Sequence, residues 1–321
     1  MTALPVRRAH ELDTCPEEQR WLIEGLWAAE AVGILGGEPK CCKSFLALDM
    51  AVAVASGAPC LRRFPTARRG RVLLFAAEDS PAVVRQRLTG IASAVGAPLD
   101  TLDIHVIVAP VLRLDVELDQ RRLEETVSAL RPMLLVLDPF VRLHRIDENS
   151  SGEVAPLLAY LRELQRRHAL AVLLVHHAKK TSGHVRAGQA LRGSSEFHAW
   201  GDSNLYLRRQ ATGQLTLTVE HRAAPSPPSV PLELQQHGPA LALAIAESTT
   251  AHIPPSASLD ERIASALEST DRPLPLAELR SLCRVRNATL HERLIALTRS
   301  GQLVRDADGY RLAHINTTAQ P

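Results

Sequence analysis

The residues with the clearest chemical potential form a short loop, "GEPKCCKSF", that begins at Gly37. Its spacing follows G-x-x-x-x-G-K-[ST], except that Cys42 stands where the second glycine is usual. In such a loop, backbone N–H groups and the positive end of the next helix surround a phosphate. The lysine neutralises phosphate charge and the serine hydroxyl binds Mg²⁺. We therefore predict a site for ATP and Mg²⁺ at Gly37, Glu38, Pro39, Lys40, Cys41, Cys42, Lys43, Ser44 and Phe45.

Cys42 raises a separate question, because its Cβ replaces a glycine hydrogen. The substitution costs little if the backbone there has a negative φ, and we then expect a tolerated variant of a working loop. A redox gate is the alternative, since a helix N-terminus and the flanking lysines lower the pKa of a thiol. The five cysteines show neither C-x-x-C nor metal-ligand spacing, and a vicinal disulfide would be strained.

Acidic residues and histidines follow at the ends of later apolar segments. Glu78 ends "LLFAAED", Asp138 ends "LLVLD", and His176 and His177 end "AVLLVHH". Behind a phosphate loop, these types suit a base that polarises water, a carboxylate that holds the Mg²⁺ shell, and a γ-phosphate sensor. Polar residues also end strands merely because strands end at the surface, but the combination favours ATP hydrolysis.

These groups need a parallel sheet to position them. Apolar segments at 31–35, 70–80, 102–108, 133–140 and 171–180 alternate with helical patterns at 44–56, 80–96, 119–132 and 151–170. Such alternation is typical of an α/β fold whose parallel sheet is covered on both faces and binds ligands at the carboxyl ends of its strands. From about residue 204, alternating segments at 204–209, 214–222, 229–236 and 240–245 predict antiparallel strands that extend the sheet.

The chain divides into an N-terminal arm (1–30), an ATPase domain (31–246), a linker (247–258), a small domain (259–315) and a tail (316–321). The small domain has three helical patterns and a hairpin pattern, the order of a winged helix-turn-helix. Arg284, Arg286 and Asn287 would lead its third helix into DNA. However, this domain has nine arginines against eight acidic residues, and winged helices also dock proteins, so both uses remain open.

Five segments together resemble one family: "WLIEGLWAAEAVGILGGEPKCCKS", "LLFAAED", "LLVLDPF", "LLVHHAKK" and "ALRGSSEFHAWGDSNLYLRR". They are similar to the RecA-like, AAA-family ATPases of the RepA type, which are hexameric plasmid replicative helicases. The resemblance implies a RecA-like P-loop core and a ring with ATP between neighbouring subunits. It also implies that Lys43 and Ser44 bind phosphate and Mg²⁺, that Glu78 is the catalytic base, that Asp138 is the Walker B acid, and that His177 belongs to the sensor motif.

The same resemblance suggests nucleic-acid contacts and an arginine finger. In the family, residues corresponding to 179–195 face the pore, so Lys179, Lys180, Arg186 and Arg192 are candidates for contacts with single-stranded DNA. An ordinary solvated loop is the alternative. Related ring helicases carry K-x-R on a late strand, where this chain has Glu220-His221-Arg222; Arg222 is the candidate finger, and the lysine is replaced by glutamate.

The bulk properties exclude other classes. The net charge of +2 gives no general attraction to nucleic acid, and no apolar run approaches the length that crosses a bilayer. We expect a cytoplasmic protein without membrane contact. The sequence predicts an ATP- and Mg²⁺-dependent ring ATPase that acts on DNA, as a helicase or in replication initiation. A nucleotide-regulated switch with little motor activity and an inactive P-loop scaffold are the alternatives.

Overall fold

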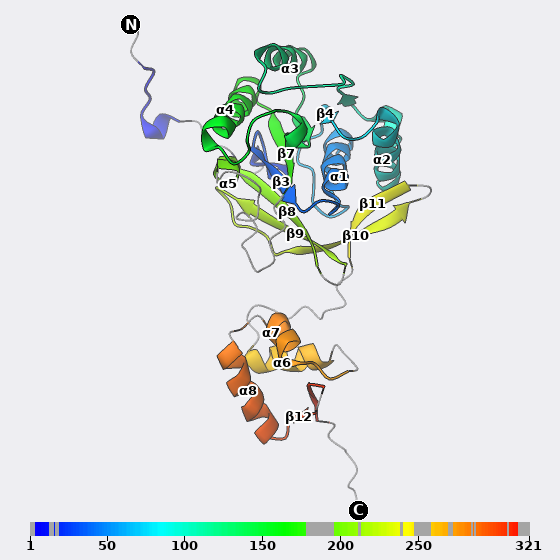
Figure 1. Ribbon diagram of the computed structural model, residues 1–321, viewed down its shortest axis with the longest axis vertical. Coiled ribbons are helices and arrows are strands. Elements are labelled where there is room, and N and C mark those ends of the chain that lie inside the picture. Colours follow the sequence, from blue (N-terminus) through cyan, green and yellow to red (C-terminus); the bar gives the residue numbers. More distant parts are fainter. Residues whose placement is uncertain are drawn as a thin grey trace, which may run out of the picture. The chain divides into compact units, whose positions relative to one another are not determined.

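The computed structural model describes residues 4–12, 16, 19–177, 196–210, 213–237, 240–246, 258–268, 272–283, 285, 287–306 and 308–313 (Figure 1). Its contacts divide the chain into two compact units. The first ends at Ala246, and the second comprises the described residues from Ser258 onward. Each unit is described here by itself.

The first unit is built on a nine-stranded sheet of order β11-β10-β9-β8-β3-β7-β6-β4-β5. Strands β3 to β8 are parallel to one another. Strands β9, β10 and β11 follow, and each is antiparallel to the strand before it. The strands are β3 (Val32–Gly37), β4 (Val72–Ala76), β5 (Ile104–Val106), β6 (Leu134–Asp138), β7 (Ala171–His177), β8 (Ser203–Arg209), β9 (Leu215–His221), β10 (Val230–His237) and β11 (Ala240–Ile245).

Helices cover both faces of this sheet, as Figure 1 shows. One buried apolar cluster joins the sheet to α1 (Lys43–Ser56) and α2 (Pro81–Ala94). A second cluster joins the opposite face to α3 (Glu117–Leu130), α4 (Ser151–His168) and α5 (Glu196–Trp200). Single-turn 3₁₀ helices occur at Ala9–Glu11 (η1), Leu99–Thr101 (η3) and Phe140–Arg142 (η4).

The predicted α/β architecture is confirmed. The apolar segments form strands because both faces of the sheet are buried, and most observed bounds fall within two or three residues of the expected ones. The segment at 102–108 supplies only a three-residue strand, β5. Strand β8 runs parallel to β3 and antiparallel to β9, so the antiparallel extension starts after β8. The sequence did not predict the lead-in hairpin of β1 (Trp21–Ile23) and β2 (Trp27–Ala28), nor the short helix α5.

Two backbones come unusually close where β3 meets β8. A Cβ placed on Gly33 would lie 1.7 Å from the carbonyl oxygen of Ser203. The hydroxyl of Ser203 accepts a hydrogen bond from the backbone N–H of Ala28 at 3.1 Å. Glycine is therefore required at position 33 by the close approach of the backbones, and β3 and β8 meet there without an intervening side chain.

The second unit comprises α6 (Leu259–Glu268), α7 (Leu276–Cys283), α8 (Asn287–Arg299) and a hairpin of β12 (Leu303–Arg305) and β13 (Tyr310–Leu312). The predicted order of three helices and a hairpin is confirmed. Its core includes Ile263, Leu279, Leu290, Leu294 and Tyr310. Among the described residues, no helix of either unit has both the length and the apolar character needed to span a membrane.

Candidate nucleotide site

The predicted phosphate loop connects the carboxyl end of β3 to the first turn of α1. Gly37 ends β3 and Lys43 begins α1, so the N–H groups at the start of a 14-residue helix face the loop. A Cβ on Gly37 would lie 2.4 Å from the carbonyl oxygen of Leu207 and 2.7 Å from Sγ of Cys41. The first glycine of the motif is therefore enforced by contact with β8 and with the loop itself.

Cys42 does not have a negative φ, so the expectation that a cysteine replaces the usual glycine at little free-energy cost is wrong. It is the N-cap of α1 with φ 67° and ψ 25°, a left-handed conformation. Lys40 also has a positive φ, of 63°. The backbone at position 42 thus favours the usual glycine, and the cysteine adopts a conformation that costs an L-residue about 1–2 kcal/mol.

The redox-gate hypothesis for Cys42 rested on a lowered thiol pKa, and this expectation is wrong. Burial raises the pKa of Cys42 above its ordinary value, although Arg209, Arg87 and Lys43 oppose the shift. Burial likewise raises the pKa of Cys41. Both thiols are free, so the pair forms no disulfide. Neither cysteine has the lowered pKa that marks a reactive thiol.

Lys43 lies inside the loop with only 5% of its surface exposed. Its ammonium donates hydrogen bonds to the carbonyl oxygens of Gly37 at 3.0 Å and of Glu38 at 2.8 Å. Burial lowers its pKa, while the charges of Cys41, Asp138 and Glu78 oppose that shift. The motif lysine is therefore positioned at the loop and within electrostatic range of both predicted carboxylates.

Two strands, β6 and β4, bring the carboxylates to the loop. Asp138 ends β6, and its carboxylate accepts a hydrogen bond from the Ser44 hydroxyl. The backbone N–H of Ala77 donates to the carbonyl oxygen of Asp138 at 2.7 Å, which fixes the chain just before Glu78 beside the end of β6. Burial, together with the charges of Asp79 and Glu78, raises the pKa of Asp138 to about 6.

The oxygen groups at this point fit Mg²⁺. The Ser44 hydroxyl and the buried Asp138 carboxylate are hydrogen-bonded to each other, and the charges of Asp79 and Glu78 act on Asp138 from nearby. The described residues contain no group of three or more His, Cys, Asp or Glu arranged to hold a metal by themselves. Mg²⁺ usually takes one or two protein oxygens and completes its shell with water and phosphate, so a two-ligand site suits it.

The histidines lie where the sensor was predicted. His177 ends β7 opposite Gly37 in the parallel register, so it stands beside the phosphate loop at the carboxyl edge of the sheet. His176 is buried and stacks on Phe197, with ring centroids 4.3 Å apart. Of the two, His177 is therefore placed toward the loop edge and His176 toward the core under α5.

Three arginines at the site were not predicted. Arg209, at the end of β8, donates to the carbonyl oxygen of Lys40 at 3.2 Å and lies 3.9 Å from Sγ of Cys42. Arg87 of α2 pairs with Asp79 and lies over the ring of Phe45, 5.1 Å from its centroid. Arg142 of η4 donates from Nε to Oε1 of Glu78 at 2.9 Å. Arg209 and Arg142 are far along the chain from their partners, and Arg87 is eight residues from Asp79; no motif marks any of the three.

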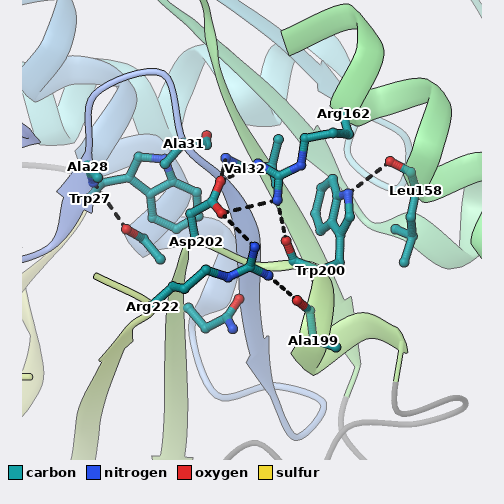
Figure 2. A network of polar contacts seen from close by, with 12 residues as sticks. Trp27, Ala28, Ala31, Val32, Leu158, Arg162, Ala199, Trp200, Asp202 and Arg222 are labelled. Atoms are coloured by element: carbon teal, nitrogen blue, oxygen red, sulfur yellow. Dashed lines mark hydrogen bonds and ion pairs between the residues drawn. The ribbon is translucent and has the colours of Figure 1, made fainter. Parts of the chain in front are cut away.

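Arg222 lies at the other end of the sheet (Figure 2). Its guanidinium pairs with Asp202 at 3.5 Å and donates to the carbonyl oxygen of Ala199. Asp202 also accepts from the backbone N–H of Val32 at 3.2 Å. Because β3 runs from Val32 to Gly37, this network is separated from the phosphate loop by the strand length, about 17 Å. Arg222 is therefore remote from the phosphate loop of its own chain.

Asp202 organises that end of the sheet. Arg162 of α4 binds both of its carboxylate oxygens and also donates to the carbonyl oxygen of Trp200, as Figure 2 shows. The neighbours of Arg222 are engaged as well: Glu220 pairs with His198 at 2.9 Å, and His221 bonds the carbonyl oxygen of Gly25 at 3.1 Å. The segment where K-x-R was expected thus makes contacts within its own subunit, and the side chain of Arg222 remains 54% exposed.

Several predicted nucleic-acid residues lie outside the described residues: Lys179, Lys180, Arg186, Arg192, Arg284 and Arg286. Asn287 begins α8, as expected for a residue that leads the third helix.

Comparisons with known proteins show the family of the chain and support its fold. A family model described as AAA domain (AAA_25) matches residues 2–183. The solved ATPase domain of another protein has a TM-score of 0.52 at 13% identity, over 68% of this chain and 85% of that one, which supports the fold. The RadB recombinase gives 0.48 at 18% identity, over 68% of this chain and 92% of that one. A KaiC-like protein from Pyrococcus horikoshii OT3 gives 0.47 at 14% identity, over 70% and 94%. The family match and the site's geometry lead to one conclusion: the chain belongs to the AAA domain family and has a RecA-like P-loop ATPase fold.

Proposed function

We propose that this protein is an ATP- and Mg²⁺-dependent ring ATPase of the RepA type that acts on DNA, as a helicase or in replication initiation. One observation carries the ATPase part. Lys43, Ser44, Asp138 and Glu78 come from three separate places in the chain and meet at the carboxyl ends of β3, β6 and β4. Open α/β sheets bind ligands at that edge.

The residues divide the work of hydrolysis as follows. The loop N–H groups and Lys43 hold the β- and γ-phosphates and neutralise their charge. Ser44 and Asp138 hold Mg²⁺, which supplies further positive charge to the phosphate oxygens. Glu78 orients the attacking water and polarises its O–H bond. His177, opposite Gly37, reports the state of the γ-phosphate to the segment that follows it.

The ring and the DNA contacts extend this proposal to the whole assembly. Arg222 lies at the sheet end remote from its own phosphate loop and has an exposed side chain, as a residue acting on a neighbouring subunit's ATP requires. Lys179, Lys180, Arg186 and Arg192 supply backbone contacts to single-stranded DNA in a homohexameric ring. Arg284, Arg286 and Asn287 supply duplex contacts.

ATP turnover with and without single-stranded DNA tests this function. We expect DNA to stimulate the wild type, and Lys43→Ala to lower turnover by at least about 100-fold, because it removes charge stabilisation at the phosphates. Arg145→Ala is the matched control, since Arg145 is exposed and has no ion pair among the described residues. Full activity of Lys43→Ala would contradict the assignment of the loop.

A nucleotide-regulated switch with little motor activity is the second candidate. It is favoured by Glu220, which replaces the lysine of K-x-R and is paired with His198 of its own subunit. This candidate predicts ATP binding without DNA stimulation, together with sequence-specific duplex binding through the second unit. That combination of results would contradict the motor function and support the switch.

A further inference from the structure

The segment between α1 and β4, residues 58–71, concentrates positive charge, and we call it the arginine loop. From Met50 to Ala77 the chain has no acidic residue and five arginines, at positions 62, 63, 68, 69 and 71, although the net charge of the whole chain is only +2. The loop leads from the C-terminal end of α1 to the first residue of β4. Because β3 and β4 belong to the same parallel set, it lies at the ends of the strands opposite the phosphate loop.

Two of the five arginines are neutralised by carboxylates and hold the loop in place. Arg62 pairs with the buried Asp49 of α1 at 3.5 Å. Arg71 pairs with Asp103 at 2.9 Å and donates to the carbonyl oxygen of Leu130 at 2.6 Å. The charges of these two are therefore used within the fold.

The other three arginines are exposed, and none pairs with a carboxylate in the part of the chain that the structure describes. The guanidinium of Arg63 lies 5.9 Å from the centroid of the Phe64 ring. Nε of Arg69 donates to the carbonyl oxygen of Ala55 at 3.0 Å, at the C-terminal end of α1, where the helix dipole favours a cation. Arg68 extends the same exposed face, so three charges remain for a ligand.

Neighbouring elements add to this charge more than they remove. Arg131 is exposed and stands two residues before Met133, whose N–H donates to the carbonyl oxygen of Arg71 at 2.8 Å. Glu24 of the lead-in hairpin is exposed beside the loop, since its N–H donates to the carbonyl oxygen of Pro65 at 2.9 Å. The added arginine and the added carboxylate cancel, and the surface stays strongly positive.

The backbone of the arginine loop is fixed before any ligand binds. Asp49, with 2% of its surface exposed, accepts a hydrogen bond from the N–H of Leu61 at 2.6 Å. Leu61 and Arg62 both adopt positive φ, of 51° and 57°, so the chain turns sharply there. Cys60 and Phe64 exchange two backbone hydrogen bonds, at 2.8 and 2.9 Å. A loop held in this way loses little conformational entropy when its side chains bind a partner.

We propose that the arginine loop binds the phosphate backbone of DNA, independently of base sequence. Guanidinium groups bind phosphate oxygens with two parallel hydrogen bonds, and unopposed arginines release the counterions of DNA. The only aromatic ring of the loop, Phe64, packs against the core, so the loop offers charge without a stacking surface.

A nucleic acid fits this surface better than an acidic protein does. Protein interfaces usually have an apolar centre, and no large apolar side chain of the arginine loop is exposed. The inference goes beyond the proposed function, because it adds a DNA contact on the side of the sheet opposite the nucleotide site, apart from residues 179–195 and from the second unit.

Fluorescence anisotropy of the full chain with labelled oligonucleotides, measured over a range of salt concentrations, tests the contact. We expect the double variant Arg63→Gln/Arg68→Gln to weaken binding at least about 10-fold at about 0.1 M salt and to reduce the slope of log K against log salt by about 2. One series uses duplex DNA and another single-stranded DNA, and a loss in either identifies the form that the loop binds.

The control Arg85→Gln/Arg145→Gln removes the same charge from two exposed arginines that have no ion pair in the described part of the chain, and should leave affinity and slope unchanged. An equal loss in both double variants, or no loss in either series, would overturn the proposal.

Arginine modification of the wild type needs no variant to fold. Phenylglyoxal labels exposed guanidinium groups, and mass spectrometry locates each labelled residue. We expect DNA at low salt to protect Arg63 and Arg68 several-fold while Arg85 stays reactive, and high salt to remove the protection, because the contact is electrostatic. Full reactivity of Arg63 and Arg68 in the DNA complex would contradict the contact. A glutamate polymer that protects them as well as DNA does would also contradict it, in favour of an acidic protein.

ATP turnover without DNA separates this inference from the proposed function. Arg63→Gln/Arg68→Gln should keep wild-type turnover, since neither arginine contacts the nucleotide site. If Lys43→Ala is inactive and DNA stimulates the wild type, but the loop variant binds DNA normally, the proposed function stands and the arginine-loop contact alone is wrong. A smaller particle mass of the loop variant in light scattering would show that the loop joins subunits, which would also overturn the proposal.

Discussion

At the scale of single residues, Asp138 shows that the site is arranged for binding at a cost in stability. Its carboxyl group is nearly buried, and burial is the main reason that its pKa is raised to about 6. Glu78 and Asp79 add negative charge nearby, and only the Ser44 hydroxyl and Lys43 favour ionisation. The charged form that Mg²⁺ needs is thus disfavoured by the fold that positions it.

The raised pKa of Asp138 determines the effect expected of Asp138→Asn. The folded pKa of about 6 exceeds the ordinary value of 3.8, so the folded state binds more protons between these two pH values and stability falls as pH rises through them. The variant has no such titration. At pH 8 we expect its free energy of unfolding to exceed that of wild type by about 1–3 kcal/mol, with the gap closing toward pH 4.

Urea unfolding at pH 4, 6 and 8 measures this difference. Asp115→Asn is the control, because Asp115 is exposed and the same change there has no buried charge to remove. A variant less stable than wild type at pH 8 would show that Ser44 and Lys43 outweigh burial. ATP turnover by Asp138→Asn should be lost whichever way its stability changes.

At the scale of elements, the junction between β3 and α1 depends on a backbone conformation that its residue disfavours. Cys42 caps α1 in the left-handed region, while Leu46 donates its N–H to the carbonyl oxygen of Cys42 at 3.2 Å. The first turn of α1 is therefore built on the strained residue, and releasing the strain should stabilise the loop that binds phosphate.

Cys42→Gly is expected to raise the free energy of unfolding by up to about 1 kcal/mol, because glycine adopts positive φ freely but loses more chain entropy on folding. Cys42→Ala keeps the Cβ and the strain, so it should bring no gain. Mild oxidant should affect ATP turnover equally in wild type and in Cys42→Gly, since the thiol pKa is raised. If oxidant inhibited the wild type but not Cys42→Gly, the redox-gate hypothesis would be supported.

The sequence predicts the elements of this fold better than their contacts. Strands β4 and β6 are apolar up to acidic residues, which follow β4 within three residues and end β6, so their type and the position of Asp138 follow from local pattern. Arg142 and Arg209 reach the site from turns and strand ends far along the chain, and nothing in their neighbours specifies that contact. The φ of Cys42 is likewise set by packing around the loop, which a motif with cysteine in place of glycine does not encode.

At the scale of the whole molecule, the phosphate loop and the proposed arginine finger lie at opposite ends of β3 in the first unit. The phosphate loop follows Gly37, while Arg222 meets Asp202 beside Val32. A ring that brings the remote end of one subunit to the loop of the next would complete each site from two chains.

Mixing two inactive variants tests this arrangement. Lys43→Ala retains Arg222 and lacks a working loop, whereas Arg222→Ala retains the loop and lacks the finger. If the subunits mix at random, about a quarter of the interfaces combine both intact parts, and turnover should recover to a corresponding fraction. Mixing Arg222→Ala with the double variant Lys43→Ala/Arg222→Ala is the control. No recovery above this control would mean that Arg222 does not act across an interface.

The backbone contact at Gly33 has a mechanical consequence. With the carbonyl oxygen of Ser203 where a Cβ would otherwise lie, the backbones of β3 and β8 leave no room for even a methyl group at position 33. One continuous strand, β3, joins the Asp202 network at Val32 to the phosphate loop at Gly37. If the protein works as the proposed ring ATPase, a displacement of the phosphate loop would reach the Asp202 network along this strand.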